Sequence, residues 1–262
     1  MKFCSIASGS DGNCIFVSSG STKILIDSGL SGITIQKSLL GIGVEPSEID
    51  AIFITHEHKD HIHGAGILSR RFSIPIYACE QTWFNMNTFI GPISEKNKHY
   101  IYRQESCFIN DMKIVPFEIP HDAISPVGYT IFTEGCKISV ATDIGHITDT
   151  IKQNISDSDI LLIESNHDLD MLKNGPYPYV LKKRIMGGFG HLSNDACGHL
   201  LVDIMSEKLK YIFLGHLSRE NNNPSLAYKT VSSILTENNI DIGGNLQLSV
   251  ANRGIVSLPV VI

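Results

Sequence analysis

The chain has 262 residues, of which 42% are hydrophobic and 18% are charged, and its formal net charge is −6 at pH 7. This composition excludes a disordered or fibrous protein. The negative total also excludes attraction of nucleic acid by the field of the whole molecule, so any phosphate site must be local.

The apolar runs are far shorter than the roughly 18 residues that a membrane span needs, and the first ten residues lack the apolar core of a signal peptide. We therefore expect no membrane partner and a cytoplasmic location. The six cysteines are scattered without a CxxC pair, which predicts free thiols in a reducing compartment. They are Cys4, Cys14, Cys79, Cys107, Cys136 and Cys197.

The first part of the chain predicts a meander of short strands. β-rich runs at 2–6, 14–17 and 23–27 are separated by Gly, Ser, Asn and Asp, which are typical turn residues. A helix is expected over 33–40. A buried strand at 51–54 then runs directly into a histidine cluster.

The rest of the chain mixes strands and helices without strict βαβ alternation. Strands are expected at 114–119, 129–133, 138–142, 160–164, 211–214 and 247–250. Helices are expected at 63–71, 148–154, 194–207 and 225–238. No linker separates these elements, so we expect an α+β arrangement of packed sheets covered by helices, forming one domain over residues 1–262.

The histidine cluster is the strongest signal in the sequence. His56, His58, Asp60 and His61 form an HxHxDH motif directly after the apolar strand. Residues two apart in an extended loop point the same way, so His56 and His58 can share one ion. Asp60 and His61 begin the next turn and face a second ion. A polar surface loop would not explain three histidines at the mouth of a buried strand.

Three more residues of ligand type follow the carboxyl ends of predicted strands: His121, Asp143 and His216. Loops at such strand ends gather functional groups on a rigid sheet. A single His or Asp there is more often a turn residue or a helix cap. Together with the HxHxDH motif, however, the three indicate a site with two metal ions.

The motifs follow the order found in the metallo-β-lactamase-fold hydrolases, which this sequence resembles over almost the whole chain. The matching positions are Asp27, Thr55 through His61, His121, Asp143 and Gly215-His216. The resemblance implies a four-layer αβ/βα sandwich. It also implies two metal sites bridged by Asp143, one with His56, His58 and His121 and the other with Asp60, His61 and His216.

Other segments resemble the YycJ/WalJ subgroup of this superfamily, bacterial proteins regarded as nucleases. They are residues 8–14, 164–168, 190–194 and 214–221. The stretch between Asp143 and His191 is too short for the inserted domain of the β-CASP nucleases, so none is expected. Asp11 and Lys59 depart from the pattern, since small polar residues are expected at both positions.

A pair of metal ions can lower the pKa of a shared water, generating a metal-bound hydroxide, and can stabilise both oxygens of an in-line displacement at phosphorus. Histidine ligands favour Zn²⁺, while the two carboxylates keep Mn²⁺ open. We expect Asp60 to orient the attacking water, His191 to protonate the leaving oxygen and Glu164 to orient His191. In the alternative interpretation, His191 is a structural residue of a Gly-rich turn and Glu164 is only a cap.

Candidate contacts to a phosphate backbone lie in three segments. The basic triplet Lys182-Lys183-Arg184 precedes His191, and the loop carrying Ser10 and Asn13 could offer backbone N–H donors to a terminal phosphate. Ser193 and Asn194 follow His191 in the third segment. Most basic triplets are solvated helix faces, which is the competing interpretation here.

Together the sequence and the resemblance predict a metal-dependent phosphodiesterase, specifically a DNA exonuclease that acts from a 5′ end. A small-molecule hydrolase that cleaves a cyclic phosphodiester, thioester or lactam is the alternative, which the net charge favours. A metal-stabilised regulatory protein is disfavoured, because a closed structural zinc site does not need seven ligands. The oligomeric state stays open.

Overall fold

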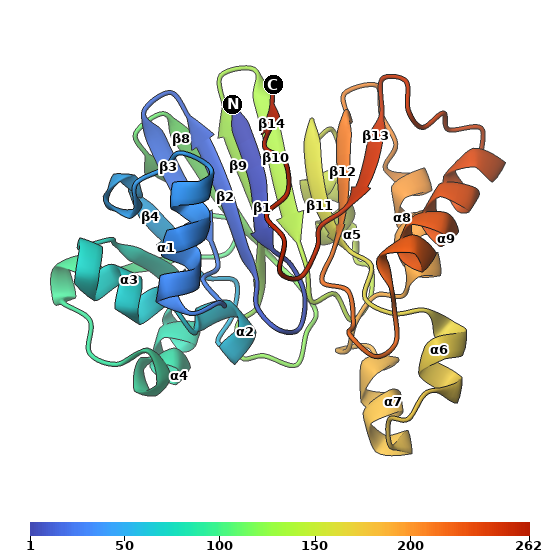
Figure 1. Ribbon diagram of the computed structural model, residues 1–262, viewed down its shortest axis with the longest axis horizontal. Coiled ribbons are helices and arrows are strands. Elements are labelled where there is room, and N and C mark those ends of the chain that lie inside the picture. The colour runs from blue at the N-terminus through green and yellow to red at the C-terminus, as the bar shows by residue number, and fades with distance from the viewer.

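The computed structural model describes residues 1–262 as two seven-stranded sheets that pack face to face, with helices on the outer face of each (Figure 1). The strand order is β14-β1-β2-β3-β4-β5-β6 in the first sheet and β13-β12-β11-β10-β9-β8-β7 in the second. The resulting layers are helix, sheet, sheet and helix, which confirms the predicted α+β fold, a four-layer αβ/βα sandwich.

The first sheet contains the predicted amino-terminal meander and three strands that the sequence analysis missed. Its strands are β1 (Lys2–Ala7), β2 (Cys14–Ser19), β3 (Thr22–Ile26), β4 (Ala51–Phe53), β5 (Ile76–Cys79), β6 (Lys98–Ile101) and β14 (Val260–Val261). β1 to β3 are antiparallel, whereas β3 to β6 run parallel. The carboxyl ends of β3 and β4 therefore lie at the same edge.

The second sheet contains all six strands predicted for the later part of the chain, and β7 in addition. Its strands are β7 (Cys107–Ile109), β8 (Met112–Glu118), β9 (Val127–Thr133), β10 (Cys136–Ala141), β11 (Ile160–Glu164), β12 (Tyr211–Gly215) and β13 (Gln247–Val250). β10 to β13 are parallel. Their carboxyl ends again share one edge.

The helices cover both outer faces. They are α1 (Gly32–Gly41), α2 (Lys59–Ile62), α3 (Ala65–Phe72), α4 (Glu80–Ile90), α5 (Asp149–Ile155), α6 (Leu169–Asn174), α7 (Tyr179–Ile185), α8 (Asn194–Asp203) and α9 (Pro224–Glu237). α1, α3 and α4 pack on the first sheet, and α5, α8 and α9 on the second. α6 and α7 extend beyond the lower end of the second sheet (Figure 1).

Two predicted helices have different bounds. The helix expected at 63–71 is observed as α3, which begins at Ala65 after the separate short helix α2. Gly64 lies between the two helices, where a Cβ would be 2.4 Å from the Leu30 carbonyl oxygen. The helix expected at 194–207 ends at Asp203, because the chain turns there so that Ile204 and Leu209 can join the core behind the second sheet.

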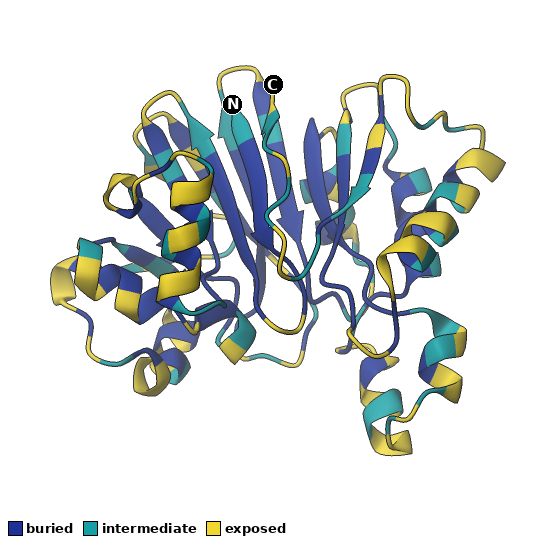
Figure 2. Cartoon of the chain, viewed as in Figure 1, coloured by how far each residue is buried: buried dark blue, intermediate teal, exposed yellow.

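The core has three parts, one between the sheets and one under each layer of helices (Figure 2). The central part contains Phe3, Phe53 and Tyr129, none of which is exposed to solvent. This apolar packing holds the two sheets in one fixed arrangement, so that loops from both sheets meet at the lower edge in Figure 1.

No helix is long and apolar enough to cross a membrane. The six cysteines are free thiols, and all but Cys107 are buried.

Candidate metal centre

The loops that follow four strands bring their polar residues to one edge of the sandwich. The HxHxDH motif follows β4, His121 follows β8, Asp143 follows β10 and His216 follows β12. Asp143 and His216 have φ angles of 60° and 54°, in the left-handed region that residues other than glycine rarely adopt. Such strained conformations cluster at functional sites, where the surrounding structure maintains them.

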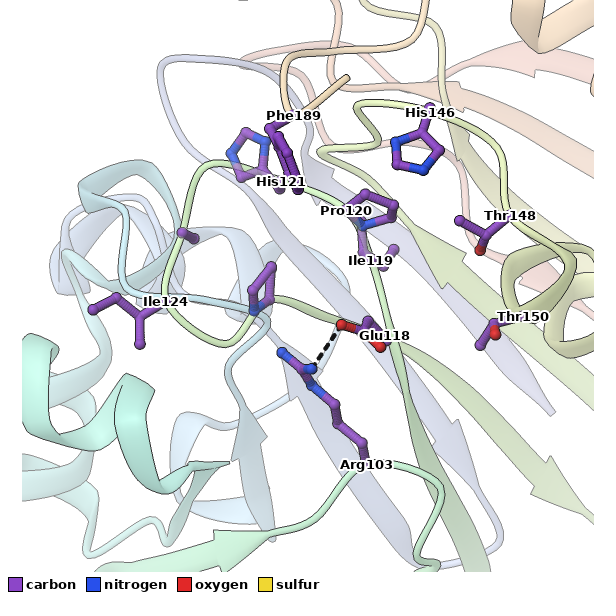
Figure 3. Close-up of a pocket in the computed structure, with 12 residues that line it drawn as sticks. Arg103, Glu118, Ile119, Pro120, His121, Ile124, His146, Thr148, Thr150 and Phe189 are labelled. Atoms are coloured by element: carbon purple, nitrogen blue, oxygen red, sulfur yellow. Dashed lines mark hydrogen bonds and ion pairs between the residues drawn. The ribbon is translucent and has the colours of Figure 1, made fainter. Parts of the chain in front are cut away.

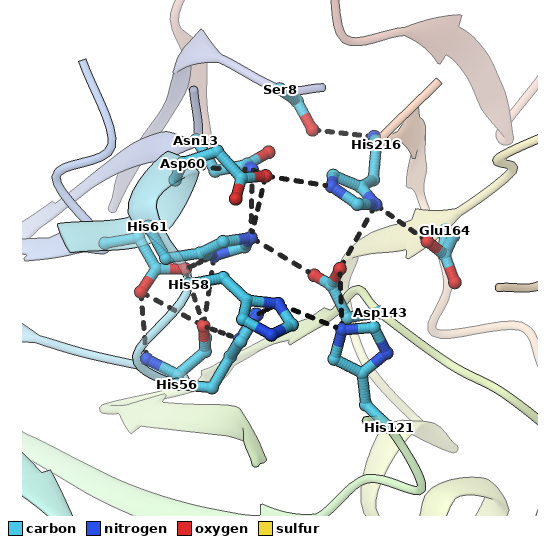
Figure 4. A network of polar contacts seen from close by, with 12 residues as sticks. Ser8, Asn13, His56, His58, Asp60, His61, His121, Asp143, Glu164 and His216 are labelled. Carbon is cyan, nitrogen blue, oxygen red and sulfur yellow. Dashed lines mark hydrogen bonds and ion pairs between the residues drawn. The ribbon is translucent and has the colours of Figure 1, made fainter. Parts of the chain in front are cut away.

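One group, the histidine trio, consists of His56, His58 and His121. The His56 Nε2 atom lies 3.0 Å from Nδ1 of His58, and that Nδ1 lies 3.3 Å from Nε2 of His121 (Figure 4). Three ring nitrogens thus converge on one point. Nδ1 of His58 takes part in both contacts and can donate a hydrogen in only one of them. A cation among them would satisfy all three.

The second group, the aspartate group, consists of Asp60, His61 and His216. One Asp60 oxygen lies 3.5 Å from Nε2 of His61 and 3.5 Å from Nε2 of His216 (Figure 4). Nε2 of His216 is buried and has no hydrogen-bond partner. The Asp60 side chain is 26% exposed, so this group is open to water on one side.

Asp143 lies between the two groups. Its Oδ1 atom is 3.6 Å from Nε2 of His121 in the trio, and its Oδ2 atom is 3.4 Å from Nε2 of His61 in the aspartate group. Oδ2 is buried without a hydrogen-bond partner. Because an unpaired buried carboxylate oxygen is costly, the arrangement fits a pair of divalent cations that share Asp143. All seven predicted ligands are therefore brought together.

The aspartate group is supported by buried carboxylates. Nδ1 of His61 lies 2.7 Å from Asp27, whose carboxylate also accepts a hydrogen bond from the Thr55 hydroxyl at 2.9 Å. Nδ1 of His216 lies 2.8 Å from Glu164. Each Nδ1–H donated to a carboxylate fixes the ring tautomer and leaves Nε2 for a metal.

The histidine trio has neutral supports instead. Nδ1 of His56 lies 3.0 Å from the Thr55 hydroxyl, and Nδ1 of His121 lies 3.2 Å from the Gly190 carbonyl oxygen.

The sequence placed Asp27 in the family motif but did not predict its contact with His61. Asp27 follows β3 and also has a left-handed backbone, with a φ of 62°. The signal in the sequence was a carboxylate at the end of an apolar strand, in the segment Asp-Ser-Gly.

The histidine pKa values shift in opposite directions in the two groups. Burial holds the pKa of His56 well below its usual value, and burial also lowers the pKa of His121. In the aspartate group, burial also lowers the pKa of His61, but the Asp27 charge outweighs it and raises this pKa well above its usual value. Against the effect of burial, Asp143 similarly raises the pKa of His216 to about 10. In the metal-free protein these two rings are therefore cationic at neutral pH.

Glu164 is fully buried, and both of its oxygens are occupied. Oε1 accepts from Nδ1 of His191 at 2.9 Å and from Nδ1 of His216, while Oε2 accepts from the backbone N–H groups of Ile144 and Leu192. Both Glu164 oxygens are therefore already engaged in hydrogen bonds, two of them with the rings of His191 and His216. Although burial opposes it, the Glu164 charge raises the pKa of His191, which favours its protonated form.

The loop at residues 8–13 packs against the cluster. The Asn13 amide nitrogen lies 3.1 Å from Nε2 of His61, and the Asn13 backbone N–H donates to the Asp60 carbonyl at 2.8 Å. Gly29 allows this approach, because a Cβ there would lie 1.6 Å from the same Asp60 oxygen. Asn13 therefore borders the aspartate group.

Of the other predicted substrate residues, Ser10 and Arg184 line a pocket of about 280 Å³ together with His191. Lys182 and Lys183 do not line it, and the Lys182 ammonium donates to the Lys173 carbonyl.

Ser193 and Asn194 are buried, and both side chains form hydrogen bonds within the chain. Ser193 caps α8 by accepting from the Ala196 N–H. Asn194 has no exposed surface and bonds to Ser165 and Asn222.

A hollow of about 450 Å³ lies on the other side of His121, between Phe189, His146 and the ion pair of Arg103 with Glu118 (Figure 3). The ion pair closes its far end at an Arg103 to Glu118 distance of 2.8 Å. His146 forms no hydrogen bond with a cluster residue. Its Nδ1 lies 2.7 Å from the Gly188 carbonyl oxygen. This hollow therefore adds no further ligand to the cluster.

Comparison with known proteins agrees with this geometry. The family described as "Beta-lactamase superfamily domain" matches residues 22–212. A protein of Streptococcus pneumoniae named exodeoxyribonuclease WalJ is 36% identical over 92% of this chain and 91% of its own. A protein of Bacillus anthracis named exodeoxyribonuclease YycJ is 35% identical over 93% of this chain and 92% of its own.

Among solved structures, the metallo-beta-lactamase fold protein YhfI of Bacillus subtilis superimposes with a TM-score of 0.72. The match covers 98% of this chain and 100% of that one at 15% identity, so it shows the shared fold. The family match spans the HxHxDH motif, His121 and Asp143. The chain belongs to the metallo-β-lactamase superfamily and, within it, to the family of the WalJ and YycJ proteins.

Proposed function

We propose that this protein is a metal-dependent exodeoxyribonuclease that hydrolyses DNA from a 5′ end as a single-domain enzyme. The observation that carries the proposal is the convergence of seven His and Asp side chains in two groups that share Asp143. The names of the relatives at 35% and 36% identity support DNA as the substrate. The cytoplasmic location stays a prediction.

In this proposal, the histidine trio would hold one ion, the aspartate group would hold the other, and Asp143 would bridge them. The predominance of histidine favours Zn²⁺, while the two carboxylates leave Mn²⁺ as a candidate. When bound, two such ions lower the pKa of water and stabilise the attacking and leaving oxygens of a displacement at phosphorus.

The residues around the cluster supply orientation and a proton. His191 gives Nδ1–H to Glu164, which leaves Nε2–H as the donor to the leaving oxygen. Asp60, the exposed carboxylate of the cluster, orients the attacking water. Arg184 and the backbone of the loop at residues 8–13 bind the phosphate next to His191.

A small-molecule phosphodiesterase is the second candidate, and one observation favours it. Of the basic triplet only Arg184 lines the pocket with His191, and Arg184 is already ion-paired with Asp122. Together with the net charge of −6, this leaves little positive surface for a long nucleic acid.

The test compares substrates for the metal-replete protein. We expect stepwise release of nucleotides from the 5′ end of labelled DNA, and much slower hydrolysis of RNA and of a nitrophenyl phosphodiester. If nucleotides were released first from the 3′ end, the proposed direction of hydrolysis would be wrong. Rapid hydrolysis of the nitrophenyl ester with intact DNA would instead favour the small-molecule enzyme.

A further inference from the structure

A second recess borders the histidine trio, on the side of α2 and α4. This groove has a volume of about 750 Å³, within the range of pockets that hold small ligands. Its walls come from the start of α2 and from the outward face of α4, and they include His58, Lys59, Phe84, Asn85 and Phe89.

The two phenylalanines of the groove are exposed to an unusual degree. Phe84 is 84% exposed and Phe89 is 78% exposed. Their helix already has an apolar face, since Trp83 and Met86 pack into the core under the first sheet. Phe84 and Phe89 therefore add nothing to the core, and two large exposed aromatic rings that line the same groove are typical of a binding site.

The groove is continuous with the candidate metal centre. His58 lines the groove, and its Nδ1 atom belongs to the histidine trio. Its neighbour Lys59 is exposed and forms no ion pair within the chain. The other charged residue of the groove is Glu57, whose Oε1 accepts from the Ile124 N–H. Lys59 is thus a free cation next to the cluster, at a position where the subgroup's pattern predicts a small polar residue.

We propose, resting on the nuclease function above, that this groove holds one unpaired nucleotide of the DNA substrate. Its base lies against Phe84 and Phe89, and its phosphate lies near Lys59. Every base has a π-face that can stack on an aromatic ring. Inside a duplex both faces of a base are covered by the neighbouring base pairs. The groove therefore selects a single strand or a frayed end, and it positions that strand for attack at the phosphate beside His58.

The test measures binding of a single-stranded oligonucleotide that carries 2-aminopurine and hydrolysis-resistant phosphorothioate linkages. Stacking of the 2-aminopurine on wild-type protein should quench its fluorescence. Phe84→Ala and Phe89→Ala should each weaken binding about 10-fold, which is about 1.4 kcal/mol, and remove part of the quenching, because each removes a base–aromatic stack. Phe84→Tyr should keep both the binding and the quenching of the wild-type protein, because tyrosine retains an aromatic ring. Lys59→Ser should reduce the salt slope of binding by about 0.7, as for the loss of one phosphate contact.

Matched controls lie in the hairpin of β7 and β8. Phe108 is 67% exposed and pairs across the strands with the exposed Lys113. Phe108→Ala and Lys113→Ser should change neither binding nor quenching. The proposal is overturned if the Phe84 and Phe89 variants bind like wild type, or if Phe108→Ala weakens binding equally.

A second copy of the chain is the competing occupant of the groove. If Phe84→Ala dissociates a dimer and leaves binding of the oligonucleotide unchanged, the groove is a subunit interface and the proposal is wrong. The nuclease function is judged separately, by whether the wild-type protein hydrolyses DNA at all.

Discussion

The histidine trio and the aspartate group lie side by side, but the protein supports them differently. The rings of His61 and His216 donate to the buried carboxylates of Asp27 and Glu164, whereas His56 and His121 contact a hydroxyl and a carbonyl. A carboxylate behind an imidazole raises its basicity and strengthens its bond to a metal. Two sites built from the same residue types are therefore tuned by the groups behind the ligands.

The largest effect is expected from Asp143→Asn, because Asp143 contacts both groups. Loss of the shared charge should weaken both sites and reduce kcat on DNA about 10³-fold, as a catalytic metal contributes several kcal/mol. Elemental analysis of the purified variant would measure the ions that remain. The neighbouring exposed Asp149→Asn, which lies in α5 outside the cluster, should keep full metal content and rate.

His191→Ala should separate proton transfer from metal binding. His191 contacts Glu164 and lies near both groups, but the proposal gives it no ligand role. We expect kcat on DNA to fall roughly 10²- to 10⁴-fold with metal content unchanged. The loss should shrink on a nitrophenyl phosphodiester, whose leaving group needs no proton.

Equal losses of the His191→Ala variant on both substrates would contradict the proton-donor role. Loss of metal would make His191 part of the scaffold. His146→Ala is the matched control, because His146 is exposed and its hydrogen bond goes to the Gly188 carbonyl and not to the cluster.

Asp27→Asn should weaken only the aspartate group. Removing a carboxylate behind a ligating histidine typically costs 10- to 100-fold in metal affinity. Competition with a chelator should therefore show one weakened site and one unchanged site. Asp50→Asn, which alters a carboxylate bonded to the Lys23 backbone far from the cluster, should leave both sites as in the wild type. Equal weakening of both sites would mean that the two groups do not bind independently.

The smallest effect is a difference in proton release. In the metal-free protein, the raised pKa values of His61 and His216 keep both rings protonated at pH 7.5, while His56 and His121 are already neutral. Filling the aspartate group should then release roughly two protons, and filling the trio fewer, because His56 and His121 have none to give. Calorimetry in buffers of different ionisation enthalpy measures this number. Because release requires protonated rings, it should decline as the pH rises toward 10, the pKa of His216.

The strands that carry the cluster could be predicted because each is a short apolar run that ends in a polar residue. α4 was missed because Thr82, Asn85, Asn87 and Thr88 are poor helix formers, and packing of Trp83 into the core stabilises the helix instead. α6 and α7 have six and seven residues, so tertiary contacts decide their existence.

The convergence of the cluster residues could be predicted from motif order, but their supports could not. The Asp27–His61 contact joins residues 34 positions apart through the parallel pairing of β3 and β4. Likewise, nothing in the segment around Ser193 and Asn194 distinguishes a helix cap and a buried amide from substrate contacts. Only the packing of α8 against the loop after β11 shows that both side chains are already satisfied.

The most direct test of a two-metal nuclease is to titrate metal-free protein with Zn²⁺ or Mn²⁺ while following hydrolysis of 5′-labelled DNA. The two groups and the shared Asp143 predict that hydrolysis continues to rise until two ions are bound per chain. The result that would contradict the account is maximal DNA hydrolysis at one ion per chain, with no further change when a second ion binds.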